Sequence, residues 1–168
     1  MSTSINASSL DLEQIAWIDS PVGLLRAGAS ESALHTLQFV NGPRSPQHES
    51  SSSPILEQTR RELAEYFAGQ RRVFEVPLSF AATPFQRRVW NALCTIGYGE
   101  RVSYLEQSRR VGDELAIRAV AQANGQNPLV ILIPCHRVIN SNGKLGGFGG
   151  GLIRKQFLLD LERGDRLL

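Results

Sequence analysis

The sequence has little of what marks a secreted or a membrane protein. Only two of its 168 residues are cysteine, which excludes a disulfide framework and suits a reducing cytoplasm. Its apolar runs stay far short of the roughly 20 residues that a transmembrane helix needs. Residues 1–9 are polar and lack both the basic region and the apolar core of a signal peptide. We therefore expect a cytoplasmic protein without a membrane segment.

Metal-ligating residues are also scarce. A structural zinc site typically uses four ligands in closely spaced pairs. The adjacent Cys135 and His136 could supply two of them. The other candidates are far away in the chain and show no paired spacing: Cys94, His35 and His48. The sequence therefore argues against a metal site.

What the chain does have is an uneven distribution of charge. Its net charge is only +2, but residues 1–82 hold nine acidic and six basic residues, whereas residues 83–168 hold seven acidic and twelve basic ones. Most of the basic residues are arginine, which suits contacts with phosphate. The asymmetry suggests that the second half meets an anion such as nucleic acid, although many solvated protein faces are basic too.

The first half of the chain has the pattern of a small α+β unit. Short β-like runs separated by turn residues predict an antiparallel meander, at 14–18, 22–27 and 33–40. The Ser- and Pro-rich segment 41–54 predicts a mobile surface loop. A helix should begin at Pro54, capped by Ser53, and should end at Gly69. We find no catalytic constellation in this half, and residues 70–82 form an extended connection.

The second half is rich in helix signals. Capping boxes begin at Thr83 and at Ser103, and Asp113 is expected to cap a third helix over 114–124. The last two of these helices, joined by a Gly-Asp turn, predict a helix-turn-helix. An ordinary helical hairpin would show the same pattern, so both interpretations stay open at this point. Further along, the chain predicts a strand over 129–133, a tight turn at Asn142-Gly143 and a last helix over 152–163.

The most informative residues are Pro134-Cys135-His136-Arg137-Val138, which follow the apolar run 129–133. A thiolate is a strong nucleophile, and a neighbouring base favours its formation. A lone cysteine after an apolar run is more often a buried structural residue. The local pattern therefore leaves a structural and a catalytic cysteine open.

A longer set of residues carries a resemblance to a known family. The chain resembles the O6-alkylguanine-DNA alkyltransferases, also called methylated-DNA–protein-cysteine methyltransferases. The matching pieces run in the family's order and spacing over about 83–164: Thr83-Pro84-Phe85-Gln86, Val89-Trp90, Tyr98-Gly99-Glu100, Val102-Ser103-Tyr104, Arg118-Ala119-Val120, Asn124-Gly125, Asn127-Pro128, 133–139, Asn142-Gly143, Gly150-Gly151-Leu152, Lys155, Leu158-Leu159 and Glu162. The first half matches more loosely, at 20–23 and at Leu63, Tyr66, Phe67 and Gly69.

The resemblance implies a fold of the α+β class in two domains. Residues 1–82 would form a small antiparallel sheet with a helix, of the ribonuclease H-like kind, together with the connecting segment. Residues 83–168 would form a mainly helical domain that holds the helix-turn-helix and the active site. No cofactor is implied, because the zinc ligands of some relatives' first domains are absent here.

The resemblance also implies DNA repair by direct reversal of damage. A methylated-DNA–[protein]-cysteine S-methyltransferase moves an alkyl group from O6 of guanine, and in many members from O4 of thymine, irreversibly to its own cysteine. Cys135 would be the acceptor, and His136 the base that acts on it through a water. Glu162 would orient His136. Tyr104 would donate a proton or a hydrogen bond to the departing base, and Asn127 would hold the active-site loop.

The implied partner is double-stranded DNA, bound through its minor groove with little sequence specificity by a monomer; cooperation between molecules stays open. The target nucleotide must be flipped out of the duplex to reach a buried thiol. Arg118 matches the family's intercalating arginine. Other residues expected at the DNA or the flipped base are Ser103, Ala116, Ala119, Arg137, Val138, Phe148 and Gly149.

Several positions depart from the family's pattern. Phe148 replaces a tyrosine, and Gly149 replaces a serine or alanine, of some members, which leaves the alkyl-group and base preferences open. Ile117 is larger than the usual alanine beside Arg118. Two other functions compete: a lesion-binding relative that transfers nothing, and a transcription regulator. Cys135 argues against the first, because that class usually lacks the acceptor cysteine, and the lack of an effector module argues against the second.

Overall fold

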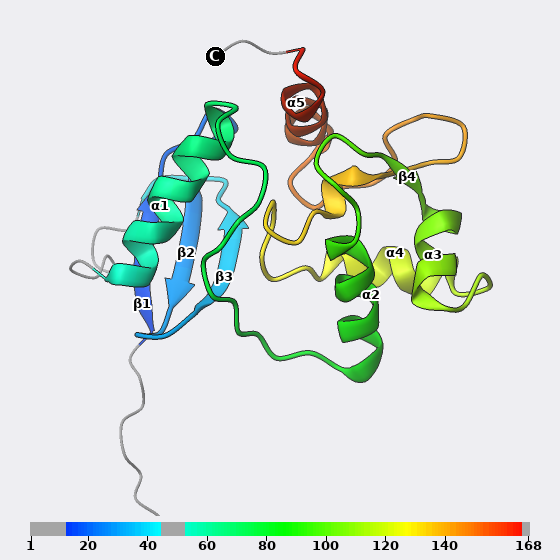
Figure 1. Cartoon of the computed structure of the whole chain (residues 1–168), viewed down its shortest axis with the longest axis horizontal. Helices are drawn as coiled ribbons and strands as arrows, with labels where there is room; N and C mark the ends of the chain where they lie inside the picture. The colour runs from blue at the N-terminus through cyan, green and yellow to red at the C-terminus, as the bar shows by residue number, and fades with distance from the viewer. Residues whose placement is uncertain (1–12, 45–52, 166–168) are drawn as a thin grey trace, which may run out of the picture.

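The computed structural model describes residues 13–44 and 53–165 (Figure 1). Most of the expected loop 41–54 therefore lies outside the described residues. Two parts lie side by side: a sheet with one helix, and a group of helices next to the edge strand of that sheet. The α+β class that the sequence predicts is confirmed. The division of the chain at residue 82 stays a prediction.

The first part is the expected meander. Its three strands pair antiparallel in the order β1-β2-β3, over Gln14–Ile18, Leu25–Ala29 and Leu34–Phe39. Helix α1, Pro54–Phe67, packs across one face of this sheet (Figure 1). Ser53 caps it by accepting from the backbone N–H of Leu56, as expected. Gly69 follows its end with a φ of 73°, a left-handed conformation that favours glycine.

The second part holds four helices and a two-stranded parallel sheet, with these bounds: α2 Pro84–Cys94, α3 Tyr104–Val111, α4 Ile117–Gly125, α5 Leu152–Arg163, β4 Val102–Ser103 and β5 Val138–Ile139. The capping box of α2 is complete: the N–H of Gln86 donates to Thr83 Oγ1 over 3.1 Å, and the N–H of Thr83 donates to Gln86 Oε1 over 3.0 Å. Among the described residues, no helix is long and apolar enough to cross a membrane.

The helix-turn-helix is present as α3 and α4, but its second helix starts later than expected. Asp113 Oδ1 accepts from the N–H of Leu115 over 2.9 Å, so it closes a tight turn rather than capping the helix. Helix α4 begins at Ile117, and its N-cap residue Ala116 makes no side-chain cap. The start expected at residue 114 was therefore wrong, because an aspartate can form either structure.

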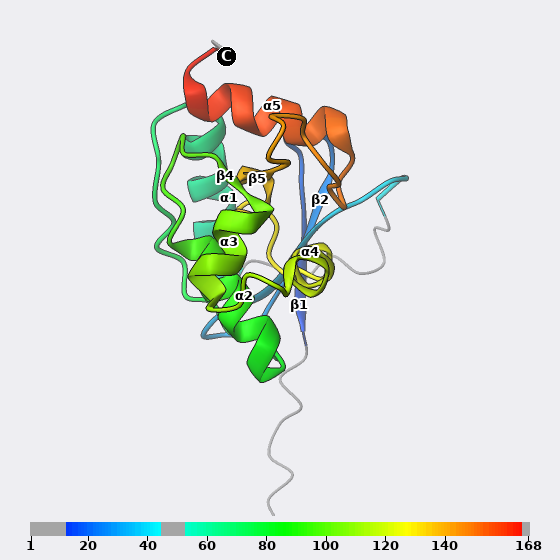
Figure 2. The same cartoon turned by 90° about the vertical axis from the view of Figure 1, so that its right-hand side faces the viewer.

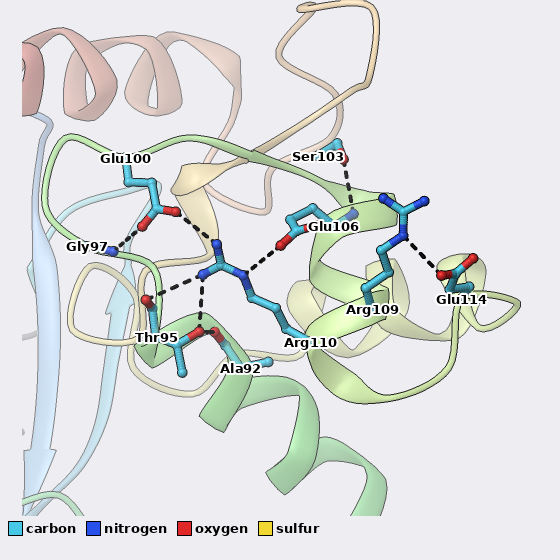
Figure 3. A network of polar contacts seen from close by, with 9 residues as sticks. All are labelled: Ala92, Thr95, Gly97, Glu100, Ser103, Glu106, Arg109, Arg110 and Glu114. Atoms are coloured by element: carbon cyan, nitrogen blue, oxygen red, sulfur yellow. Dashed lines mark hydrogen bonds and ion pairs between the residues drawn. The ribbon is translucent and has the colours of Figure 1, made fainter.

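Arginine side chains on α3 fasten this unit to its surroundings (Figure 3). Arg110 donates to Glu100 over 2.9 Å and to Glu106 over 3.2 Å, and its guanidinium also reaches Thr95 at the end of α2. Glu106 therefore binds Arg110 instead of completing the expected reciprocal box, although its N–H does donate to Ser103 Oγ over 3.0 Å. Arg110 lies in the last turn of α3, so the network ties this turn to the end of α2 and to the segment before β4.

The apolar run 129–133 does not form the expected strand. It folds into a buried turn in which the N–H of Ile133 donates to the carbonyl of Leu129 over 2.9 Å. Ile131, at the centre, has a φ of 73°, which is the one positive value of a non-glycine residue in the described ranges. A short buried apolar run cannot be assigned from periodicity alone. The turn also joins the two parts, because the N–H of Val130 donates to the carbonyl of Leu37 in β3 over 3.1 Å.

Candidate active site

Cys135 lies at the start of a 3₁₀ turn, Cys135–Arg137, directly after Pro134. Its side chain is almost buried, with 8% exposed. Asn127 Nδ2 donates to Cys135 Sγ over 3.2 Å and to the carbonyl of Ile133 over 2.7 Å. Burial raises the pKa of the Cys135 thiol, whereas the hydrogen bond from Asn127 and the charge of Lys155 lower it. The structure therefore places Asn127 on the sulfur as well as on the loop.

His136 and Glu162 form a buried pair beside this cysteine. His136 Nε2 and Glu162 Oε1 are 2.8 Å apart. Burial lowers the pKa of His136, although Glu162 opposes that effect. A neutral ring that donates from Nε2 to Glu162 has its lone pair on Nδ1. Nδ1 is buried and has no protein hydrogen-bond partner among the described residues, so it is the atom left to accept a proton.

Glu162 receives more donors than the sequence predicts. Arg137 Nε donates to Oε2 over 2.9 Å and Arg137 Nη2 donates to Oε1 over 2.9 Å. Tyr66 Oη donates to Oε1 over 2.8 Å, and the N–H of Gly99 donates to Oε2 over 3.3 Å. Burial alone would raise the pKa of Glu162, but the hydrogen bonds and charges of His136 and Arg137 hold it well below its usual range.

Arg137 is thus not where we expected it. Its guanidinium is buried, pairs with Glu162 and donates to the carbonyl of Ile96 over 2.6 Å. Releasing it would leave a buried carboxylate without its main counter-charge, which is expensive. The expected contact between Arg137 and DNA is therefore corrected: this side chain holds the buried carboxylate.

A cavity of about 460 Å³ opens in front of the cysteine. Tyr104 lines it and donates from its hydroxyl to the carbonyl of Gly147 over 3.3 Å. Burial raises the pKa of Tyr104, so its hydroxyl remains a donor at neutral pH. Phe148 and Gly149 line the same cavity, as expected for a substrate loop. A smaller cavity of about 170 Å³ shares Cys135 and reaches Phe39 in β3.

Helix α4 forms the mouth of the larger cavity. Arg118 is exposed there, and Ile117 lines the cavity beside it. Ala119 is exposed and Ala116 half-buried, so this surface carries little side-chain bulk at these two positions. Ser103 is already engaged as the cap of α3, which leaves its hydroxyl hydrogen free to donate.

Val138 is fully buried, and both of its backbone groups are engaged. Its N–H donates to the carbonyl of Cys135, and its carbonyl accepts from Lys155 Nζ over 2.6 Å. Val138 does not line the cavity in front of the cysteine, so its expected contact with a base edge stays a prediction.

Lys155, whose role could not be predicted from the sequence, is fully buried. Lys155 Nζ donates to the carbonyls of Val138, Leu145 and Gly147 over 2.6, 2.5 and 3.2 Å. Burial lowers the pKa of Lys155 to about 8. Lysine is normally a surface residue, so no local signal could have found it; its place in the family pattern was the one available hint. Lys155 ties the substrate loop to the cysteine turn.

The described residues contain no group of histidine, cysteine and acidic side chains that could hold a metal ion. The fold and the site together define a helix-turn-helix protein with a nearly buried cysteine, next in sequence to a buried histidine–glutamate pair, in a pocket lined by its second helix. The expectation that no cofactor is needed stays a prediction.

Comparisons with known proteins now name the family. Residues 84–164 match the DNA-binding domain of 6-O-methylguanine DNA methyltransferase, and residues 15–80 match the ribonuclease-like domain of the same enzyme. A methylated-DNA–protein-cysteine methyltransferase of Mycolicibacterium paratuberculosis is 45% identical over 87% of this chain and 90% of its own length. The constitutive enzyme of Bacillus subtilis is 48% identical over 86% and 92%. The chain belongs to the methylated-DNA–protein-cysteine methyltransferase family.

Solved structures agree with this assignment. The O6-methylguanine methyltransferase of Mycobacterium tuberculosis matches with a TM-score of 0.82 and 41% identity, over 92% of this chain and 95% of that one. The Mycobacterium tuberculosis OGT in complex with DNA matches with a TM-score of 0.82 and 43% identity, over 90% and 93%.

Proposed function

We propose that this protein repairs DNA by moving an alkyl group from O6 of guanine, and from O4 of thymine, onto its own Cys135. The transfer is irreversible, and each molecule acts once. The observation that carries the proposal is the cysteine beside a buried His136–Glu162 pair, in a pocket whose mouth is helix α4. Family membership supports it, because the relatives are named for this reaction.

The chemistry divides among the residues around the pocket. His136 accepts the thiol proton at Nδ1 through a water, and Glu162 stabilises the imidazolium that results. The thiolate of Cys135 attacks the alkyl carbon, so a carbon–sulfur bond forms as the carbon–oxygen bond breaks. The electron pair of the broken bond stays with the base. Tyr104 donates a proton or a hydrogen bond to the leaving base.

DNA binding places α4 in the minor groove. Flipping a nucleotide costs a few kcal/mol, and a poorly paired lesion costs less. Arg118 fills the space that the flipped base leaves, and Ala116 and Ala119 allow close approach to the backbone. The minor groove gives little sequence information, which suits repair at any site. The protein acts as a cytoplasmic monomer on double-stranded DNA.

The flipped base would then rest on the groups that line the pocket. Phe148 and Gly149 would enclose it from the substrate loop. Ser103 and the backbone of Val138 lie outside the pocket lining, and the family resemblance implies that they meet the edge of the base.

A direct test weighs the intact protein after mixing it with an oligonucleotide that contains O6-methylguanine. We expect a mass gain of one methyl group that maps to Cys135 and is absent in Cys135→Ala. Serum albumin with its own free thiol, treated in parallel, should gain nothing. If the protein binds the oligonucleotide and gains no mass, it is a lesion-binding protein and the proposal is wrong.

A further inference from the structure

One donor to Glu162 comes from the part of the chain in which we found no catalytic constellation. Tyr66 lies in the last turn of α1, and Glu162 lies in the last turn of α5, 96 residues later. The ends of these two helices approach each other in both views (Figures 1 and 2). The Tyr66 ring is fully buried, and its hydroxyl donates to Glu162 Oε1 over 2.8 Å.

We propose that Tyr66 is a positioning residue of the proton relay: its hydroxyl shares Glu162 Oε1 with the N–H of His136 and so sets how strongly His136 takes the thiol proton. The inference rests on the proposed function, because it assigns Tyr66 to the relay of that reaction. It also makes the sheet-containing part of the chain a contributor to the chemistry.

Several hydrogen-bond donors converge on the carboxylate of Glu162. Two carboxylate oxygens offer about four lone-pair positions. Oε1 accepts from Tyr66, His136 and Arg137, and Oε2 accepts from Arg137 and the N–H of Gly99. All the acceptor capacity is therefore used. Each additional donor draws negative charge away from the hydrogen bond to His136, so the carboxylate stabilises an imidazolium less strongly than it would with fewer partners.

Tyr66 is suited to be a permanent donor. Burial, and then the charge and hydrogen bond of Glu162, raise the pKa of Tyr66 well above its usual value, so its hydroxyl keeps its proton. Its ring is fixed by edge contacts with Phe67 at 5.3 Å and Tyr98 at 6.1 Å between centroids. The hydroxyl therefore reaches the carboxylate from a rigid position.

Other charged and titratable groups also surround His136. From α5 come Glu162 and Lys155, from its own turn Cys135 and Arg137, and from α1, through the carboxylate, Tyr66. If His136 is the base, methyl transfer slows at any pH at which His136 already carries a proton. The pH at which His136 gains its proton therefore sets the acid limb of the pH–rate profile, which is the fall in rate at low pH. Removing the Tyr66 hydroxyl leaves the other groups in place and strengthens the bond between His136 and Glu162. The acid limb should therefore move to higher pH.

The test compares Tyr66→Phe with Tyr98→Phe. The second variant loses a hydroxyl from the adjacent ring, and that hydroxyl makes no hydrogen bond to Glu162 in the described structure. Single-turnover methyl transfer is measured from pH 5 to 9, and the Nε2-bound proton of His136 is followed by NMR in ¹⁵N-histidine-labelled protein. For Tyr66→Phe we expect the acid limb to shift by about 0.5 pH unit to higher pH, so that transfer at a given pH on this limb is about threefold slower. The signal of the Nε2-bound proton should move to lower field. Tyr98→Phe should do neither.

Equal responses of the two variants, or an unmoved proton signal in Tyr66→Phe, would overturn the inference. If Tyr66→Phe does not fold, 3-fluorotyrosine incorporated at position 66 keeps the ring and makes the hydroxyl a stronger donor. The proton signal and the acid limb should then move in the opposite direction, and a shift in the same direction or none would contradict the proposal. The NMR signal needs no methyl transfer, so a wild-type protein that fails to transfer would refute the proposed function without deciding the role of Tyr66.

Discussion

Two regions of the molecule depart from the usual distribution of polar and apolar residues. The buried residues behind Cys135 are polar, whereas residues exposed at the start of α4 are apolar. Behind the cysteine, polar and charged side chains are in the core: His136 is 0% exposed, and Glu162 and Arg137 are 7% exposed. In front of it, apolar side chains face solvent: Leu115 in the turn before α4 is 96% exposed and Ile117 is 38% exposed. Buried charges and exposed large apolar residues are both uncommon.

The difference shows where each set finds its partners. Every oxygen of Glu162 is satisfied within the protein, so this carboxylate needs no partner from a ligand. Leu115 is almost fully exposed and Ile117 is partly exposed, and minor-groove proteins commonly place such side chains against DNA. Changes in the relay should therefore affect folding and chemistry, whereas changes on α4 should affect DNA alone.

The largest effect on stability and on methyl transfer is expected for a substitution of Glu162, the carboxylate at the centre of the buried polar residues. Glu162→Gln removes the counter-charge of a buried Arg137 and the acceptor of His136, so unfolding in urea should require about 3–5 kcal/mol less. Methyl transfer should fall by at least about a hundredfold, because the base loses its support. The matched control Glu106→Gln removes an exposed partner of Arg110 and should cost about 0.5 kcal/mol or less. Equal costs would contradict the distinction between the two environments.

The same carboxylate predicts a pH dependence of stability. The pKa of Glu162 is depressed in the folded protein, so its contribution is complete above the unfolded value of about 4.3 and is lost as pH falls below that. Wild-type stability should fall below about pH 4 more steeply than that of Glu162→Gln. Urea unfolding at a series of pH values measures both slopes, and parallel slopes would argue against a depressed pKa.

Lys155 tests the connection between the relay and the substrate loop. Lys155→Met keeps the length of the side chain but leaves three carbonyls without their charged donor, so we expect a loss of about 2–3 kcal/mol in stability. Amide hydrogen exchange of residues 145–150 should become faster, while that of α2 should change little. Unchanged exchange in the loop would show that Lys155 does not hold it.

On the exposed side, Arg118 should matter for duplex DNA alone. In Arg118→Ala, transfer from duplex DNA should fall about tenfold, which corresponds to about 1.4 kcal/mol of the cost of flipping. Transfer from free O6-methylguanine should change little, because a free base needs no flipping. Arg163→Ala removes the same charge at the far end of α5 and serves as the control. Equal losses with both substrates would refute the role of Arg118.

The smallest effect is expected for the apolar residue before α4. Leu115→Ser should weaken binding to duplex DNA about two- to threefold in a fluorescence titration and should change stability by less than about 0.5 kcal/mol. Ile153→Ser, which alters a residue 89% exposed on α5, should change neither quantity. If the two variants bind DNA equally well, Leu115 does not lie in the DNA interface.

The sequence predicted those features whose signals are local. Caps at Ser53 and Thr83 were confirmed because a cap depends on its own residue and the next few backbone N–H groups. The run 129–133 was misread as a strand, and the start of the second helix of the motif was placed too early at residue 114. In both cases the same residues suit two local structures. A long-range bond to Leu37 accompanies the turn at 129–133, whereas a local bond between Asp113 and Leu115 forms the turn before α4.

The site shows the same limit. The family pattern named Cys135, His136 and Glu162, and the structure brings His136 and Glu162 to hydrogen-bond distance. The roles of those residues stay predictions. The resemblance placed Arg137 at the DNA, and no residue near it in the chain indicates that it pairs with a buried carboxylate 25 residues later.

By itself, the sequence determined the class of the fold, the ends of most helices and, through the family pattern, the cysteine and its expected reaction. Each of these depends on short-range chemistry or on a motif that can be read in order. Only the tertiary structure decided which groups bind Glu162 of α5, because they come from α1, from the segment before β4 and from the cysteine turn. The physical reason is burial, since a carboxylate removed from water must find all its donors within the protein.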